Sequence, residues 1–183
     1  IPYLHRLILR KELDPRLLAG HLWIYSTEVN TTSSPLKQFT SGEPVAMTTQ
    51  QGRWIANGYV NPQSLICARV TTHQRNQVLD AGLIEQRLRQ ALALRERLYG
   101  SPCYRLVFGE SDGLPGLVID RFGDYLSMQI STAGMERLKD EILTAVEHLL
   151  APKGIILRND IAVRQQEGLE QEIIVAHGTL PER

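Results

Sequence analysis

The sequence has few cysteines and aromatic residues, and it lacks a long hydrophobic run. Its two cysteines, Cys67 and Cys103, lie far apart among 183 residues, so we expect neither a disulfide framework nor a cysteine-based metal site. No apolar run approaches the ~20 residues that a membrane-spanning helix needs. The first residues also lack the long apolar stretch and small-residue cleavage site of a secretory signal peptide. These absences predict a reduced, cytoplasmic protein with no membrane partner.

Recognisable catalytic and metal-binding patterns are also missing. The five histidines show no metal-ligand spacing, and the sequence has no Walker loop and no glycine-rich strand-to-helix turn for a nucleotide-like cofactor. Cys103 follows a proline, as a catalytic thiolate can, but "SPCYRLVF" is typical of a strand in which cysteine acts as a small hydrophobe. The 183 residues alone are therefore predicted to be inactive, with no catalytic, cofactor-binding or metal-binding residue.

The formal net charge is zero, but the charges are unevenly spread. Residues 1–78 hold eight Lys and Arg against four Asp and Glu, a net of +4, and the remainder holds 12 against 16, a net of −4. A basic first part beside an acidic second part favours contact with phosphate in the first part.

Short alternating runs separated by turns dominate the first third of the sequence. A short helix is expected from Asp14, a candidate N-cap, to Gly20, a candidate C-cap. The expected strands cover residues 4–9, 43–49, 53–60 and 65–72. This pattern predicts a small β-barrel-like domain over residues 1–75.

The second part mixes helical and strand patterns. Apolar residues at helical spacing predict a helix over Leu83–Leu98, capped by Asp80, within a connecting segment 76–100. An α+β domain is predicted over 101–183, with a helix over 135–149 and strands over 104–108, 117–122, 125–130, 155–157 and 173–175. The predicted fold class is therefore mixed.

The stretch "VFGESDGLPGLVIDRFGD" (107–124) concentrates glycines and acids. Its spacing fails the calcium-loop pattern, because Leu114 and Gly116 occupy the third and fifth positions counted from Asp112. Ser111-Asp112-Gly113 and Phe122-Gly123-Asp124 are typical of hairpin turns. Metal binding, catalysis and a docking surface for another domain or for RNA stay open as alternatives.

Basic residues surround the predicted short helix and Trp23. Basic side chains with an aromatic residue among them can bind phosphates and stack a base. The alternative is a solvated charged surface with Trp23 and Trp54 in the core. The predicted RNA-binding residues are Arg10, Lys11, Arg16, His21, Arg53 and Arg69.

Four segments carry a family resemblance: "GHLWIYSTEV", "GEPVAMTTQQGRWIANGYVNPQSLICARV", "YRLVFGESDGLPGLVIDRFGDYLSMQISTAGME" and "RNDIAVRQQEGLE". In this order they resemble the N-terminal part of bacterial class I rRNA large-subunit methyltransferases. These enzymes use S-adenosylmethionine (SAM) to form 5-methylcytosine in 23S rRNA. The resemblance covers roughly residues 4–181, and one departure is Leu22, where relatives usually carry proline.

The resemblance implies three domains in the full-length protein. These would be a PUA RNA-binding domain, a central strand-strand-helix-strand-strand domain, and a catalytic domain that follows "HGTLPER". The cofactor SAM and the catalytic cysteine would then belong to a catalytic domain that this sequence does not include. The implied partners are 23S rRNA and that C-terminal catalytic domain.

Two other functions remain open at this point. The chain is also consistent with a structural scaffold that docks the catalytic domain or forms a homodimer, with little RNA binding of its own. The docking residues would be Glu110, Asp112, Gly113 and Gly116. A metal-dependent hydrolase that uses Glu110 and Asp112 is the third alternative.

Overall fold

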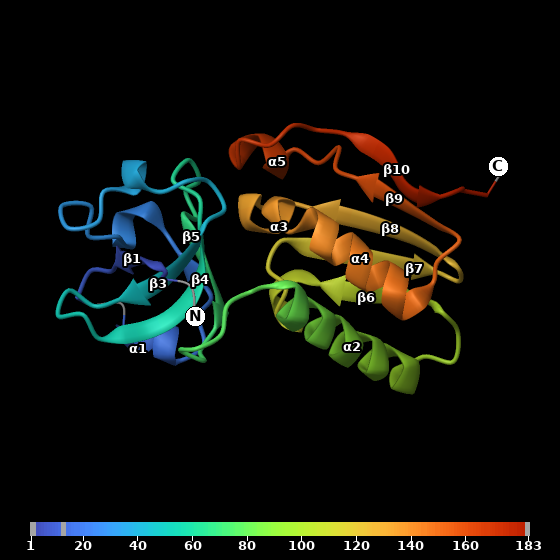
Figure 1. Cartoon of the computed structure of the whole chain (residues 1–183), viewed down its shortest axis with the longest axis horizontal. Helices are drawn as coiled ribbons and strands as arrows, with labels where there is room; N and C mark the ends of the chain where they lie inside the picture. The colour runs from blue at the N-terminus through green and yellow to red at the C-terminus, as the bar shows by residue number, and fades with distance from the viewer. Residues whose placement is uncertain (1–2, 12–13, 182–183) are drawn as a thin grey trace. The chain divides into compact units, whose positions relative to one another are not determined.

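The computed structural model describes residues 3–11 and 14–181, and the chain forms two compact units, Ile1–Leu79 and Asp80–Arg183. Each unit contains one five-stranded mixed sheet (Figure 1). Within the described residues, no helix combines the length and the apolar character that crossing a bilayer requires.

The sheet of the first unit curves towards a barrel. Its strand order is β1-β3-β4-β5-β2; β1 runs parallel to β3, and the other neighbours are antiparallel. Leu9, just after β1, forms a bridge with Val29, and Arg10 N donates to Glu28 O at 3.0 Å. These contacts join the two edges of the sheet. The strands are β1 (His5–Ile8), β2 (Trp23–Ile24), β3 (Pro44–Thr48), β4 (Trp54–Val60) and β5 (Ala68–Thr72).

Helix α1 (Asp14–Leu18) begins and ends near its predicted bounds. Gly20 has φ 98°, a left-handed conformation that glycine adopts without steric cost. Its N–H donates to Leu17 O, and His21 N donates to Arg16 O at 3.1 Å, which ends the helix. The predicted cap at Asp14 falls on a side chain outside the described part. Two short 3-10 helices, η1 (Ser26–Glu28) and η2 (Leu36–Gln38), follow β2.

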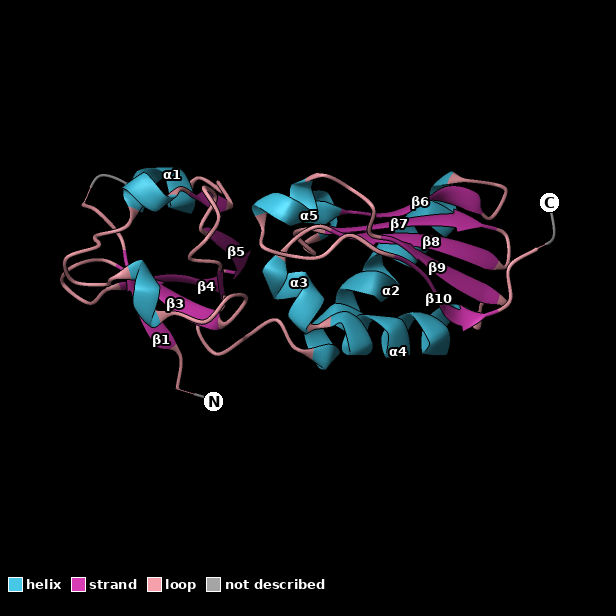
Figure 2. Cartoon of the chain, turned by 90° about the horizontal axis from the view of Figure 1, so that it is seen from above, coloured by secondary structure: helices cyan, strands magenta, loops and turns pink. Residues whose placement is uncertain are grey.

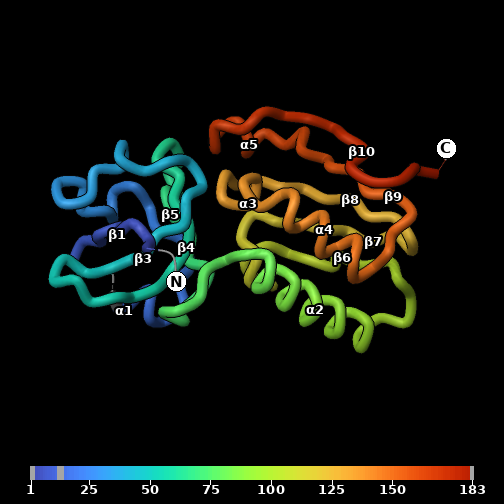
Figure 3. Tube along the Cα trace, viewed as in Figure 1, coloured from blue at the N-terminus to red at the C-terminus, as the bar shows by residue number. Residues whose placement is uncertain are grey.

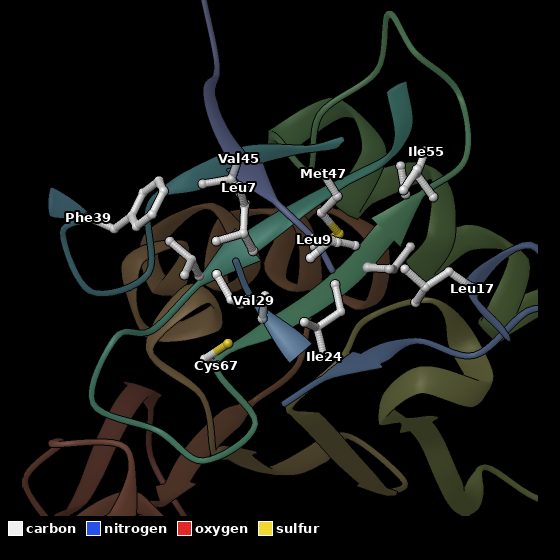
Figure 4. Packing of buried hydrophobic residues seen from close by; sticks show 14 residues of the cluster. Leu7, Leu9, Leu17, Ile24, Val29, Phe39, Val45, Met47, Ile55 and Cys67 are labelled. Atoms are coloured by element: carbon white, nitrogen blue, oxygen red, sulfur yellow. The ribbon is translucent and has the colours of Figure 1, made fainter. Parts of the chain in front are cut away.

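The core of the first unit draws apolar residues from all five strands and from α1 (Figure 4). Ile24 is fully buried, so its neighbour Trp23 points to the opposite side of β2 and is 36% exposed. The interpretation of Trp23 as a core residue is therefore wrong. Trp54 is half-buried, and its Nε1 donates to Asn57 Oδ1 at 2.8 Å.

The second unit is a sheet in the order β10-β9-β8-β7-β6. Its parallel pair, β8 and β9, needs a crossover connection, and Figure 3 follows the chain from β8 through two helices into β9. The strands are β6 (Cys103–Phe108), β7 (Leu117–Phe122), β8 (Tyr125–Ile130), β9 (Gly154–Arg158) and β10 (Ile173–Gly178). The α-helices are α2 (Ala81–Leu98), α3 (Ala133–Arg137), α4 (Lys139–Leu150) and α5 (Val163–Gln166).

One face of this sheet is buried against helices, and Figure 2 shows α3 and α4 along that face. The alternation of the strands decides which residues they cover. Ile119 in β7, Met128 in β8 and Leu157 in β9 are buried, as are Ile142 and Val146 on α4.

Helix α2 lies in the second unit, whereas the sequence predicts a connecting helix over 76–100 and a domain from 101. The helix packs on α4 and β6, and its residues Ile84 and Leu88 are buried in that contact. An apolar stripe of this kind needs a packing partner, so the helix contributes to the core of the unit. The predicted cap is confirmed, because the Asp80 carboxylate accepts from Leu83 N at 2.9 Å.

Two further differences concern the strand and helix order. Three strands, β6 to β8, precede α3 and α4, so the order implied by the family resemblance is one strand short. The helix predicted over 135–149 is divided at Leu138, whose backbone has φ −102° and ψ 16°. Leu138 N donates to Met135 O at 3.0 Å, a tight turn that ends α3 before α4 begins.

A buried arginine joins α5 to the end of the sheet. Arg164 is 2% exposed, and it donates to Ile130 O at 2.7 Å, Glu170 O at 2.6 Å and Glu136 Oε2 at 2.8 Å. Burial alone would raise the pKa of Glu136, but hydrogen bonds from Arg164 and Lys139 outweigh it and lower the pKa. This carboxylate therefore stabilises the fold in its charged form.

We expect this contribution to disappear in acid. A lowered folded-state pKa gives stability that is complete above the unfolded pKa and is lost as the pH falls through the folded pKa. Glu136→Gln keeps the shape but does not titrate. The free energy of unfolding should then depend less on pH between ~5 and ~3 than in the parent protein. Urea unfolding at several pH values measures this, and identical pH profiles would contradict it.

The two thiols should react very differently. Cys67 belongs to the core, and burial raises the pKa of its thiol to about 12. Cys103 is exposed at the start of β6, which corrects its interpretation as a buried residue. Iodoacetamide at neutral pH should modify Cys103 in the folded protein and Cys67 after denaturation. Peptide mass spectrometry checks the assignment, and early modification of Cys67 would refute it.

Candidate RNA interface

Three predicted RNA-binding residues are exposed near one end of the first unit. Leu9 N donates at 2.9 Å to O of Thr48, the last residue of β3. Arg10 and Lys11 follow directly, so they leave β1 beside the β3–β4 turn, which carries Arg53. All three side chains are exposed. The fold therefore gathers basic residues that are more than 40 positions apart in sequence.

A fourth basic residue, Arg6, joins them and was not predicted as a contact. Its Nη2 donates to Thr48 Oγ1 at 3.4 Å, and a Cβ on Gly52 would lie 3.3 Å from the same nitrogen. The signal was present in β1, where Leu7 faces the core and Arg6 must point outward. We call Arg6, Arg10, Lys11 and Arg53 the basic end.

Arg16 is engaged in the fold itself. Its Nη2 lies 2.5 Å from Glu28 Oε1 and donates to Trp23 O at 3.3 Å. The other carboxylate oxygen of Glu28 accepts from Tyr25 N at 2.8 Å. Arg16 thus fastens α1 to the segment after β2, and its charge is largely neutralised there.

Arg69 and His21 are also less accessible than the basic end. Arg69 is 9% exposed, and its guanidinium lies 5.4 Å from the centre of the Trp23 ring, across the β2–β5 pair. His21 is half-buried, and its Nε2 makes no hydrogen bond with the described atoms. The predicted set therefore divides into an exposed group (Arg10, Lys11 and Arg53) and a less exposed group (Arg16, His21 and Arg69).

The two groups meet at Glu28. Its carbonyl oxygen accepts from Arg10 N, while its carboxylate binds Arg16. Arg10 also donates from Nε to Val29 O at 3.3 Å. The residue that pairs with Arg16 therefore also positions the backbone of Arg10.

The glycine-rich loop of the second unit connects β6 to β7 through the 3-10 helix η3 (Gly109–Asp112). The Asp112 carboxylate binds Arg95 of α2 through both oxygens, one at 2.7 Å, and also accepts from Phe108 N at 2.7 Å. Arg87 Nη1 donates to Gly113 O. The Asp112 side chain is only 7% exposed, so it is poorly placed for acid–base chemistry or for holding a metal.

Gly116, at the end of the same loop, lies very close to the Thr132 side chain. Its φ is 85°, and a Cβ there would lie 2.3 Å from Thr132 Oγ1. The tight turn beyond β7 is a hairpin as predicted, since β7 and β8 pair in antiparallel register from Leu117 to Phe122. Docking of another domain through Glu110, Asp112, Gly113 and Gly116 stays a prediction.

Two N–H groups of the strand-to-helix turn after β8 bind the protein's own oxygens. Ala133 N donates to Glu167 Oε2 at 3.1 Å, and Met135 N donates to Thr132 Oγ1. N–H groups bound in this way are not available to an anion at the helix N-terminus. Across residues 3–11 and 14–181, no group of three or more His, Cys, Asp or Glu side chains is placed to hold a metal ion.

A comparison with protein families matches most of the first unit. Residues 7–73 match the family described as "PUA-like domain". The basic end therefore lies in, or directly beside, the matched segment.

The whole chain has curated relatives. It is 41% identical over 179 residues to "Ribosomal RNA large subunit methyltransferase I" of Klebsiella pneumoniae subsp. pneumoniae, and the match covers 96% of this chain and 44% of the relative. The protein of the same name from Yersinia pseudotuberculosis is 40% identical over 170 residues, which is 90% of this chain and 41% of the relative. The chain is homologous to these proteins but spans less than half of their length.

Solved structures share the fold at low sequence identity. "A putative sam-dependent methyltransferase from Streptococcus mutans" superposes with a TM-score of 0.76 at 14% identity, over 97% of this chain and 44% of that chain. "SMU.776, a putative methyltransferase complexed with SAH" gives a TM-score of 0.78 at 14% identity, over 97% and 43%. At this identity the likeness establishes the fold.

We expect Asp112→Ala to destabilise the second unit. The change leaves Arg95 in a largely buried position without its carboxylate, which typically costs ~3–5 kcal/mol of unfolding free energy. The matched control is Arg89→Ala, which removes an exposed pair with Glu85 and should cost ~0.5 kcal/mol or less. Denaturant unfolding measures both. Equal, small losses would contradict a structural role for Asp112.

Proposed function

We propose that this chain is the RNA-recognition part of a SAM-dependent methyltransferase that forms 5-methylcytosine in 23S rRNA. One observation carries the proposal. An exposed basic end accompanies a PUA-like domain in a chain that is 41% identical to ribosomal RNA large subunit methyltransferase I.

The chemistry of the basic end suits the RNA backbone. Guanidinium and ammonium groups bind phosphates without reading sequence and position the protein on its nucleic acid. The first unit holds eight Lys and Arg against four Asp and Glu, so its net charge of +4 also attracts RNA at a distance. Arg16 would support this surface indirectly, because it binds Glu28, whose carbonyl oxygen accepts from Arg10 N.

Catalysis would belong to the rest of the full-length protein. An enzyme that modifies a base must extrude it from the stack and enclose it in a pocket beside the cofactor. The occupied N–H groups of Ala133 and Met135 in the turn after β8 support a division of labour in which SAM and the catalytic thiol lie in another domain. The 183 residues would then bind cytoplasmic 23S rRNA without methylating it.

A scaffold function is the second candidate. It is favoured by the second unit, whose net charge is −4 and whose sheet exposes Phe108 and Phe122. Such a unit is better suited to a protein contact than to a polyanion. The two functions are compatible because they use different units of the chain.

The proposed RNA contact can be tested with a 23S rRNA fragment at two salt concentrations. Arg6→Ala with Arg10→Ala should weaken binding and lower the slope of log affinity against log salt by about 1 for each lost phosphate contact. Fluorescence anisotropy with a labelled fragment gives both quantities.

The control is Arg97→Ala, an exposed arginine on α2 in the second unit. This variant also removes arginine charge, so it measures how much affinity is lost through weaker non-specific attraction between the protein and RNA. Unchanged binding by the double variant, or an equal loss with Arg97→Ala, would rule out the basic end as the contact.

A further inference from the structure

The sheet of the second unit has one face that its own helices do not cover. Because Ile119, Met128 and Leu157 face the helices, their neighbours along each strand point to the opposite side. The strand register places Phe108 opposite Val118, and Val175 opposite Ile156. We call this surface the open face; its apolar members are Phe108, Val118, Phe122, Ile156, Ile173 and Val175.

The open face exposes several large apolar side chains. Phe122 is 59% exposed, Phe108 54%, Ile173 57% and Val175 50%. They lie on β6, β7 and β10, at both sides of the sheet, with the paired Arg105 and Asp120 and the β8 residues Ser127 and Gln129 between them. Several large exposed apolar side chains on one face favour contact with another macromolecule.

The charges on this face favour protein over RNA. Arg105 binds Asp120 at 2.8 and 3.1 Å, and Arg158 binds Asp160 at 3.1 Å, so each arginine is neutralised by its neighbour. Arg105 also lies over the Phe108 ring, 5.3 Å from its centre. With a net charge of −4 on the unit, these arginines leave little attraction for phosphate.

We propose that the open face is covered by the further domain of the full-length protein. This inference rests on the proposed function, in which catalysis belongs to that domain. The curated relatives are more than twice as long as their match to this chain, which covers 44% of them. Strand β10 is both the last strand described and an edge of this sheet, so a domain that follows it is tethered beside the open face.

The size of the face supports a tethered partner over a second copy of the chain. Five strands at ~4.8 Å spacing and ~20 Å length give roughly 500 Å². A free-standing complex usually buries about 800 Å² on each partner. A tethered domain needs less buried area for a stable contact, because the linker holds it at a high effective concentration.

Cys103 is a native reporter for this contact. It is exposed, and it pairs with Phe122 across β6 and β7, so it lies at the edge of the open face. A domain seated on the face would shield the thiol from a reagent in solution. Cys67 is buried in the other unit and serves as the unreactive reference.

The experiment compares the reaction of Cys103 with iodoacetamide in the 183-residue chain and in the full-length protein. Peptide mass spectrometry follows this one thiol. We expect the reaction to be at least tenfold slower in the full-length protein. Phe122→Asp with Val175→Asp in the full-length protein should restore the fast rate, and Leu98→Asp, at an equally exposed leucine on α2, should not.

Each other outcome overturns the proposal. Equal rates in both proteins mean that the face stays uncovered. Slowing that appears in the 183-residue chain at high concentration points to a second copy, and slowing that requires added rRNA points to RNA. The expected result needs no RNA, so this experiment is independent of the RNA-binding test. Docking can be refuted while RNA binding by the basic end is confirmed, and RNA binding can be refuted while docking is confirmed.

Discussion

Glu28 holds together the end of the first unit on which its proposed function depends. Its carbonyl accepts from Arg10 N, one carboxylate oxygen binds Arg16, and the other accepts from Tyr25 N. These bonds join β1, α1 and the segment after β2 at one point. With the edges of the sheet closed there, the basic residues that follow β1 have a defined place beside the β3–β4 turn.

The second unit follows a different constraint, which is that its sheet is packed on one side. The buried contacts of α2 and α4 stabilise one face and leave the other to solvent or to a partner. The Arg95–Asp112 pair fixes the glycine-rich loop to α2, so this conspicuous stretch of sequence is explained mainly by packing. The two units thus combine an exposed basic end with an exposed apolar face, and each surface suits a different kind of partner.

Much of the fold follows from local patterns in the sequence. Alternation gives every strand of both sheets except the two-residue β2, helical spacing gives α2, and the Asp80 cap marks its start. The glycines at Gly20 and Gly116 adopt the left-handed backbone that their turns require. The match of residues 7–73 to the PUA-like family could also be anticipated, because the segments that resemble the methyltransferase family lie in order along the chain.

The sequence by itself determined the elements, the turns and the sign of the charge on each unit. Only the tertiary structure decided which charges remain accessible: Arg16 and Arg69 are held by Glu28 and Trp23, while Arg6 is brought beside the β3–β4 turn. It also decided that Trp23 points outward and that α2 belongs to the second unit. The reason is physical. A helix or a turn depends on neighbours in sequence, whereas exposure and ion pairing depend on residues that only folding brings together.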